Sequence, residues 1–78
     1  MNIQEEVFDM ISAEREHQDN KWGSQRALYP NEWYLILGEE IGEVANAILE
    51  SKTDAEIEEE LVQVAAVAVC WLEALRHD

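Results

Sequence analysis

Two long helix-forming stretches joined by only a few residues restrict the fold of this chain most. Residues 31–50 and 54–76 are rich in Leu, Ile, Val, Ala and Glu and contain no proline. Thr53 and Glu56 form the capping-box pattern that opens a helix, which predicts that the second stretch begins there. Because so short a connection favours adjacent packing, the sequence predicts an antiparallel helical hairpin.

A further helix is predicted before the hairpin. Apolar residues at positions 3, 7, 10 and 11 recur at helical spacing, and Asn2 with Glu5 forms a second capping box. We therefore expect a helix over residues 3–18. Residues 19–31 lack this periodicity and contain glycine, serine and proline, which is typical of a loop. The predicted fold is all-α, with an N-terminal helix and a helical hairpin in one domain, residues 1–78.

The apolar pattern of the hairpin predicts self-association. The third helix is apolar on nearly every side from Leu61 to Leu72, which is more than one subunit of 78 residues can cover. We expect this helix to form the interface of a homo-oligomer, a dimer or a tetramer, completed as a helical bundle. Gly42 suggests close approach of a backbone or ligand. The second helix is expected to pack through Trp33, Leu37, Ile41, Val44, Ala45 and Ile48.

Composition limits the partners of the chain. Eighteen acidic and five basic residues give a formal charge of −13, which argues against binding to duplex nucleic acid or an anionic membrane. A hydrophobic fraction of 47% favours a folded protein. No apolar run is long enough to span a bilayer, and the start resembles no secretory signal. Cys70 is the only cysteine and is expected in the core, so we predict a cytoplasmic protein.

Two acidic motifs lie within the hairpin. The first is Glu-Glu-Ile-Gly-Glu at residues 39–43, and the second is Glu-Leu-Val-Gln at residues 60–63. Helical residues three apart share a face, so Glu40 lies beside Glu43, and Glu60 beside Gln63. Two antiparallel helices would bring these three carboxylates and one amide oxygen into one patch. Such hard oxygen donors suit Mg²⁺ or Mn²⁺.

These motifs resemble those of the MazG-like, all-α nucleotide pyrophosphohydrolase superfamily, E-x-x-E preceded by a further Glu and followed on the next helix by E-x-x-D. The resemblance implies hydrolysis of nucleoside triphosphates to monophosphate and pyrophosphate, and so control of the nucleotide pool. It implies that Glu40, Glu43, Glu60 and Gln63 hold Mg²⁺. Glu39 is then a further ligand or the base for the attacking water, in a catalytic group with Glu40 and Glu43.

A segment before the hairpin is similar to a Lys-Trp-Gly element found in some small members of that superfamily. By this resemblance Lys21 would meet a phosphate, and Trp22 would either stack on the base or pack from the loop onto the core. Arg15 and Arg26 are further candidates for phosphate contacts.

One departure from the motif leaves other functions open. Gln63 stands where the family has aspartate, which removes a negative charge and leaves a weaker metal donor. A weak or inactive relative that binds nucleotide or metal is therefore the first alternative. The second is an acidic interaction module that uses its negative surface to block a basic partner.

Overall fold

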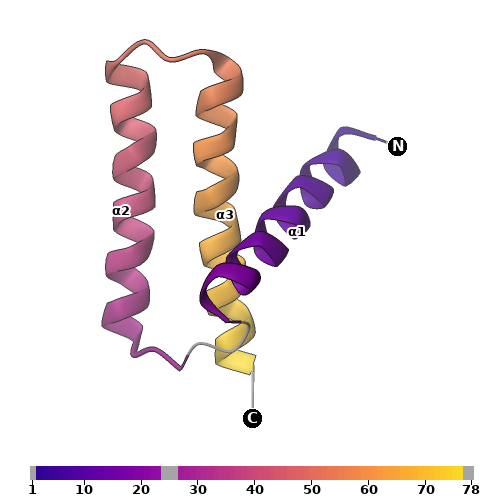
Figure 1. The fold of residues 1–78 in the computed structure, drawn as a ribbon, viewed down its shortest axis with the longest axis vertical. Helices are drawn as coiled ribbons and strands as arrows, with labels where there is room; N and C mark the ends of the chain where they lie inside the picture. The colour runs from indigo at the N-terminus through magenta and orange to yellow at the C-terminus, as the bar shows by residue number, and fades with distance from the viewer. Residues whose placement is uncertain (1, 24–26, 77–78) are drawn as a thin grey trace.

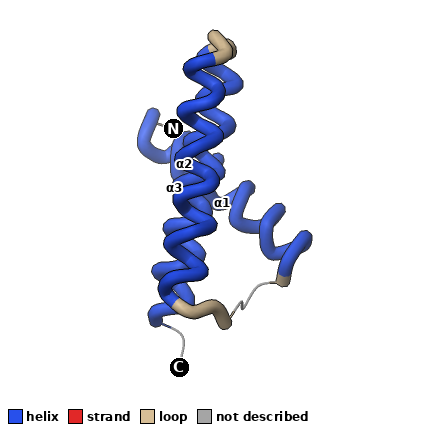
Figure 2. The backbone as a smooth tube through the Cα atoms, turned by 90° about the vertical axis from the view of Figure 1, so that its left-hand side faces the viewer, coloured by secondary structure: helices blue, strands red, loops and turns tan. Residues whose placement is uncertain are grey.

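The computed structural model describes residues 2–23 and 27–76, and all regular structure in these residues is helical. The helices are α1 (Ile3–Trp22), α2 (Pro30–Leu49) and α3 (Asp54–Arg76). Helices α2 and α3 run antiparallel as neighbours, and α1 crosses the outer side of α3 obliquely (Figures 1 and 2). The predicted N-terminal helix and hairpin are thus confirmed. No helix in the described ranges has an apolar stretch that could cross a membrane.

Local hydrogen bonds fix where α1 and α3 begin. The Asn2 side chain accepts a hydrogen bond of 2.8 Å from the backbone N–H of Glu5. The Thr53 hydroxyl accepts one of 3.2 Å from the N–H of Glu56, and the Glu56 carboxylate accepts one of 3.3 Å from the N–H of Thr53. The capping box at Thr53 is therefore complete, and at Asn2 the side-chain half of the box is formed.

The connection between α2 and α3 closes tightly. Ser51 adopts a left-handed backbone conformation with φ 56°, and the N–H of Lys52 donates to the carbonyl of Ala47 at 2.9 Å. This six-to-one bond is the one that ends a helix in a Schellman motif. It reverses the chain and so sets which turns of α2 and α3 lie opposite each other.

Helix α1 is one turn longer than the sequence predicted. It ends at Trp22, because Gly23 takes a φ of 91° and donates its N–H to the carbonyl of Asp19 at 2.8 Å. The polar last turn is supported by an ion pair between Arg15 and Asp19, four residues apart. The predicted end at Gln18 was therefore wrong, and Trp22 lies on a helix and not in a loop.

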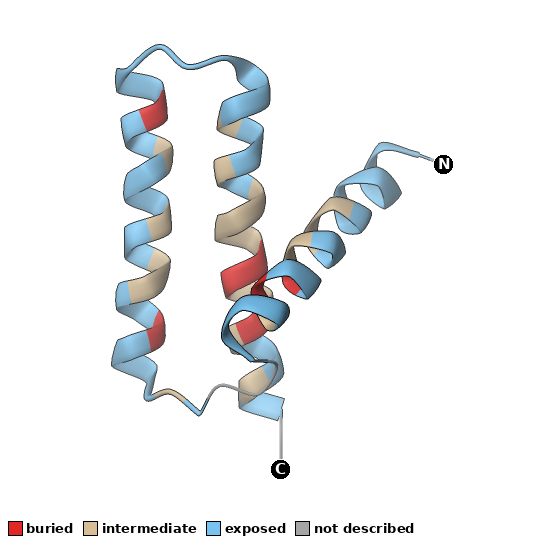
Figure 3. Ribbon diagram, viewed as in Figure 1, coloured by how far each residue is buried: buried red, intermediate tan, exposed pale blue. Residues whose placement is uncertain are grey.

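The core is small and lies between α2 and α3. Trp33 is 1% exposed and packs with buried Val67 and Cys70, as expected for Cys70. The rings of Trp33 and Trp71 stack with centroids 6.3 Å apart. Buried residues of α3 also lie where α1 crosses it (Figure 3). Because α3 is the middle helix, part of its all-round apolar character is used within one chain.

The predicted packing side of α2 needs a correction. Trp33 is buried and Leu37 and Val44 are half-buried, but Ile41 and Ile48 are more than half exposed, and the small Ala45 is also exposed. Successive helical residues differ by about 100° around the axis, so these three point away from the row that faces α3. A Cβ added to Gly42 would meet no atom within 4 Å, so no described residue makes the predicted close approach there.

Candidate metal site

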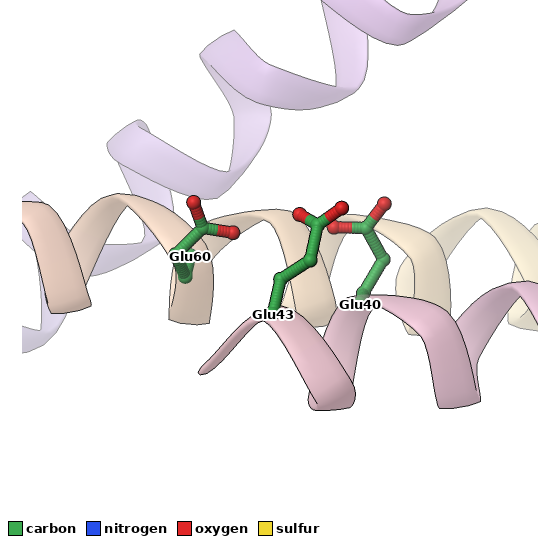
Figure 4. Close-up of side chains that lie close together, drawn as sticks. All are labelled: Glu40, Glu43 and Glu60. Atoms are coloured by element: carbon green, nitrogen blue, oxygen red, sulfur yellow. The ribbon is translucent and has the colours of Figure 1, made fainter. Parts of the chain in front are cut away.

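Three carboxylates converge between the two hairpin helices. Glu40 and Glu43 come from successive turns of α2, and Glu60 comes from the opposite turn of α3 (Figure 4). One oxygen of each carboxylate lies within 4.8 Å of the others. The spacing of three residues on α2 and the short connection to α3 bring about this arrangement, as the sequence predicted.

The site is negative and partly shielded from water. Glu40 and Glu60 are half-buried, and the Oε2 atom of each is buried without a hydrogen-bond partner among the described residues. Among the described residues, no ion pair involves Glu40, Glu43 or Glu60. Buried polar atoms without partners are uncommon because each loses its hydration. A donor or a cation beside these two oxygens would therefore stabilise them.

The same surroundings shift the protonation of two of these groups. Burial raises the pKa of Glu40 above its ordinary value, and the negative charges of Glu43 and Glu60 raise it further. Burial also raises the pKa of Glu60, as does its contact with the Glu43 carboxylate. Both pKa shifts have the same cause, because each carboxylate is partly removed from water and lies beside other negative charges. A bound divalent cation would neutralise this repulsion between the carboxylates.

Helix α1 adds a further carboxylate that the sequence reasoning missed. Glu14 is half-buried, and its charge contributes to the raised pKa of Glu40. Gln18 donates a hydrogen bond of 3.3 Å to Glu14 and keeps its own Oε1 buried without a partner. The available signal was Glu14 following Met10 at helical spacing, where an acid interrupts the apolar row.

Glu39 and Gln63, the other two residues of the predicted site, are not among the three carboxylates that converge. Glu39 is exposed on α2, and its charge also raises the pKa of Glu40. Gln63 is half-buried on α3, one turn after Glu60 and on the same face of the helix. Their roles as base and fourth ligand stay predictions.

A hollow of about 270 Å³ adjoins the cluster toward the α2–α3 connection. Its charged lining consists of Glu43, Glu50, Glu56, Glu59, Glu60 and Lys52. The Lys52 ammonium pairs with Glu50 at 3.7 Å. Five carboxylates against one ammonium would repel a phosphate group, so an anionic ligand needs bound cations to enter here.

The described members of the predicted substrate set, Arg15, Lys21 and Trp22, do not line the hollow. Arg15 is buried and bonded to Asp19 at 2.7 Å and to Glu73, so a phosphate would have to displace a carboxylate. Lys21 is exposed, with its Nζ 4.5 Å from the centroid of the Trp22 ring, which is 53% exposed. These two lie on the last turn of α1, about 12 Å along the helix from Glu14. Arg26 lies outside the described residues.

The donor set fits a hard divalent cation. Carboxylate oxygens dominate it, two of them lack partners, and no sulfur or imidazole ligand belongs to the group. Mg²⁺ and Mn²⁺ take such oxygens and complete their shell with water or phosphate. No family model, curated protein or solved structure matches this chain, so the class of site rests on its residues.

Proposed function

We propose that this protein is a Mg²⁺-dependent nucleoside triphosphate pyrophosphohydrolase, active also with Mn²⁺, that works as a homo-oligomer in the cytoplasm. The convergence of Glu40, Glu43 and Glu60, with two buried oxygens lacking partners, is the observation that carries the proposal. This convergence supports the binding of a divalent cation. The reaction follows from the likeness of the acidic motifs to those of the MazG-like superfamily. The lone buried Cys70 supports a reducing compartment.

The charges of the site suit this chemistry. A triphosphate is repelled by a carboxylate cluster unless divalent cations lie between them. Glu40, Glu43 and Glu60 would hold such a cation next to the hollow. When bound, Mg²⁺ supplies neutralisation of phosphate charge and a more acidic water. Glu39 is exposed next to the cluster and would accept the proton of that water. Gln63 would offer a neutral oxygen.

Pyrophosphate release tests the proposal. The protein is incubated with a panel of ribo- and deoxyribonucleoside triphosphates and Mg²⁺ or Mn²⁺, and monophosphate and pyrophosphate are measured. We expect release that falls at least about hundredfold in Glu43→Gln, because the variant keeps the shape of the side chain and loses a metal-binding charge. Glu58→Gln removes an exposed acid of α3 outside the cluster and serves as the matched control. Equal release by both variants would sink the assignment.

Gln63 favours a second candidate, a relative that binds metal or nucleotide without turnover. In that case the unmodified protein binds Mn²⁺ in calorimetry but releases no pyrophosphate, and Gln63→Asp creates or raises the activity. In a competent enzyme the same substitution changes little or lowers the rate. A protein that binds neither metal nor nucleotide would leave the acidic interaction module, whose effect survives the joint change Glu40→Ala and Glu43→Ala because sixteen acids remain.

A further inference from the structure

Helix α1 lies on the side of the hairpin toward which the metal-site carboxylates point. The side chains of Glu40, Glu43 and Glu60 are all turned to this side (Figure 4). Helix α1 packs there against α3, and its Arg15 is bonded to Glu73 of that helix. It can therefore add side chains to the site from outside the two acidic motifs of the hairpin.

Two polar side chains of α1, Glu14 and Gln18, lie one turn apart and are removed from water. Glu14 is half-buried, and Gln18 is only 3% exposed. The Nε2 atom of Gln18 donates a hydrogen bond of 3.3 Å to Oε2 of Glu14, which orients that carboxylate. Besides burial and the two neighbouring carboxylates, the charge of Glu14 raises the pKa of Glu40. The pair on α1 therefore lies beside the carboxylate cluster.

The polar atoms of this pair are only partly satisfied within the described part of the chain. Oε1 of Gln18 is buried there without a hydrogen-bond partner. Glu14 takes part in no ion pair among these residues, and the guanidinium of the neighbouring Arg15 is bonded to Asp19 and Glu73. A buried amide oxygen without a donor and a half-buried carboxylate without a cation are both unfavourable. A hydrogen-bond donor with positive charge behind it would stabilise both.

Water bound to a divalent cation is a donor of this kind. Mg²⁺ usually keeps several water ligands, and the ion makes these waters more acidic. A carboxylate oxygen and an amide oxygen can both accept a hydrogen bond from such a water. Glu14 does not belong to the group whose oxygens lie within 4.8 Å of one another. Contact through water therefore fits its position better than a direct bond to the ion.

We infer that α1 completes the cation site, with Glu14 and Gln18 accepting hydrogen bonds from water on the ion that the three hairpin carboxylates hold. Glu14 thereby adds a fourth carboxylate to a site in which Gln63 is neutral. Partners of this kind orient the ligands of a metal and raise its affinity. Lys21 and Trp22 lie on the next turn of α1, so the ion also fixes these predicted substrate residues. The inference rests on the cation site of the proposed function and not on its reaction.

Calorimetric titration with Mn²⁺ tests this inference. Glu14→Gln should raise the Mn²⁺ dissociation constant by about tenfold or more, because loss of an outer partner typically weakens metal binding by about 10–100-fold. Glu16→Gln makes the same change at an exposed position of α1 and should bind as the unmodified protein does. In EDTA the Glu14→Gln variant should melt no lower than the unmodified protein, because glutamine can still accept the bond from Gln18. A purely structural role would lower that melting temperature and leave the Mn²⁺ affinity unchanged.

Hydrogen exchange gives a second measurement, which needs no variant. Mg²⁺ should slow the exchange of amides in α1 as well as in α2 and α3, because the ion links α1 to the hairpin. In Glu14→Gln the slowing in α1 should fall relative to the slowing in the hairpin. Should the variant not fold, the unmodified protein decides, since α1 amides that Mg²⁺ leaves unchanged overturn the inference.

The titration also separates this inference from the proposed function. If Glu43→Gln loses Mn²⁺ binding while Glu14→Gln binds as tightly as the unmodified protein, the cation site stands and the role of α1 is overturned. If the unmodified protein binds no Mn²⁺, the cation site itself fails, and the role of α1 fails with it.

Discussion

Replacing Glu40 by Gln should make the metal-free protein more stable while weakening its response to Mg²⁺. Glu40 lies beside two other carboxylates and has a buried oxygen without a partner among the described residues. Glutamine keeps nearly the same shape, removes one of the repelling charges and brings an amide that can donate to a neighbouring carboxylate. A substitution that stabilises the protein but harms ion binding is the signature of a site built for a cation.

The size of the effect follows from the geometry. Two unit charges 4.8 Å apart repel by about 0.9 kcal/mol in bulk water and about 3.5 kcal/mol at an effective dielectric constant of 20. Glu43 is exposed, which favours the lower part of this range, and the substitution removes the repulsion of Glu40 with both neighbours. We therefore expect a gain of roughly 1–2 kcal/mol in the free energy of unfolding. For a chain of this size that raises the melting temperature by roughly 5–15 °C.

Thermal unfolding followed by circular dichroism measures both effects at one protein concentration. In EDTA the Glu40→Gln variant should melt above the unmodified protein. In Mg²⁺ the unmodified protein gains stability by ligand binding, about 2.7 kcal/mol at a hundred times the dissociation constant, and the variant gains less. Glu58→Gln should behave as the unmodified protein in both solutions. A variant that melts lower in EDTA, or that responds fully to Mg²⁺, would refute the reasoning.

The metal-free protein should also gain stability from this cluster as the pH falls. The pKa values of Glu40 and Glu60 are raised in the folded protein, so the folded state binds their protons more tightly than the unfolded state does. The repulsion is fully present above the raised pKa values and fades as the pH falls through them toward the ordinary value. The difference in melting temperature between Glu40→Gln and the unmodified protein in EDTA should therefore shrink as the pH is lowered from neutral toward the ordinary pKa of glutamate. A constant difference would contradict the assigned cause.

Three further substitutions test the fold through urea denaturation. Arg15→Met removes the buried guanidinium that joins α1 to Glu73 on α3, and should lower the free energy of unfolding by roughly 1–2 kcal/mol. Thr53→Ala removes the capping side chain of α3 and should lower it by about 1 kcal/mol. Trp33→Ala empties the centre of the core and should lower it by about 3–5 kcal/mol, so a loss under 1 kcal/mol would contradict the packing described.

Features that depend on residues close in the sequence could be predicted. The caps at Asn2 and Thr53 involve partners three residues away, and both were predicted. The convergence of Glu40, Glu43 and Glu60 is also nearly local, because a turn of four residues joins the two helices. Once that turn fixes the register, few turns of α3 can face a given turn of α2. The convergence of these three carboxylates is thus a property of the hairpin alone.

Features that depend on α1 could not be predicted in the same way. Arg15 meets Glu73 across 58 residues, and no local pattern links the two. The apolar residues Ile3 and Val7, from which this helix was predicted, are exposed. Their spacing therefore does not show which side of α1 packs against α3. The charge of Glu14 affects the pKa of Glu40 only because α1 packs against the hairpin. The position of α1 is set by tertiary contacts, which a single sequence does not display.

Helix α2 assigns neighbouring residues of one motif to different surfaces. Glu40 and Glu43 converge with Glu60 of α3, whereas Ile41 is more than half exposed and points away from the row that faces α3. If a second copy of the proposed homo-oligomer covers Ile41, it and a cation in the carboxylate cluster would act on opposite sides of the hairpin, and their effects on stability should add. Leu72→Glu separates them best, because Leu72 lies about 18 Å along α3 from Glu60. A folded, monomeric Leu72→Glu variant should keep the full Mg²⁺-dependent rise in melting temperature, and loss of that rise would show that the second copy helps to hold the ion.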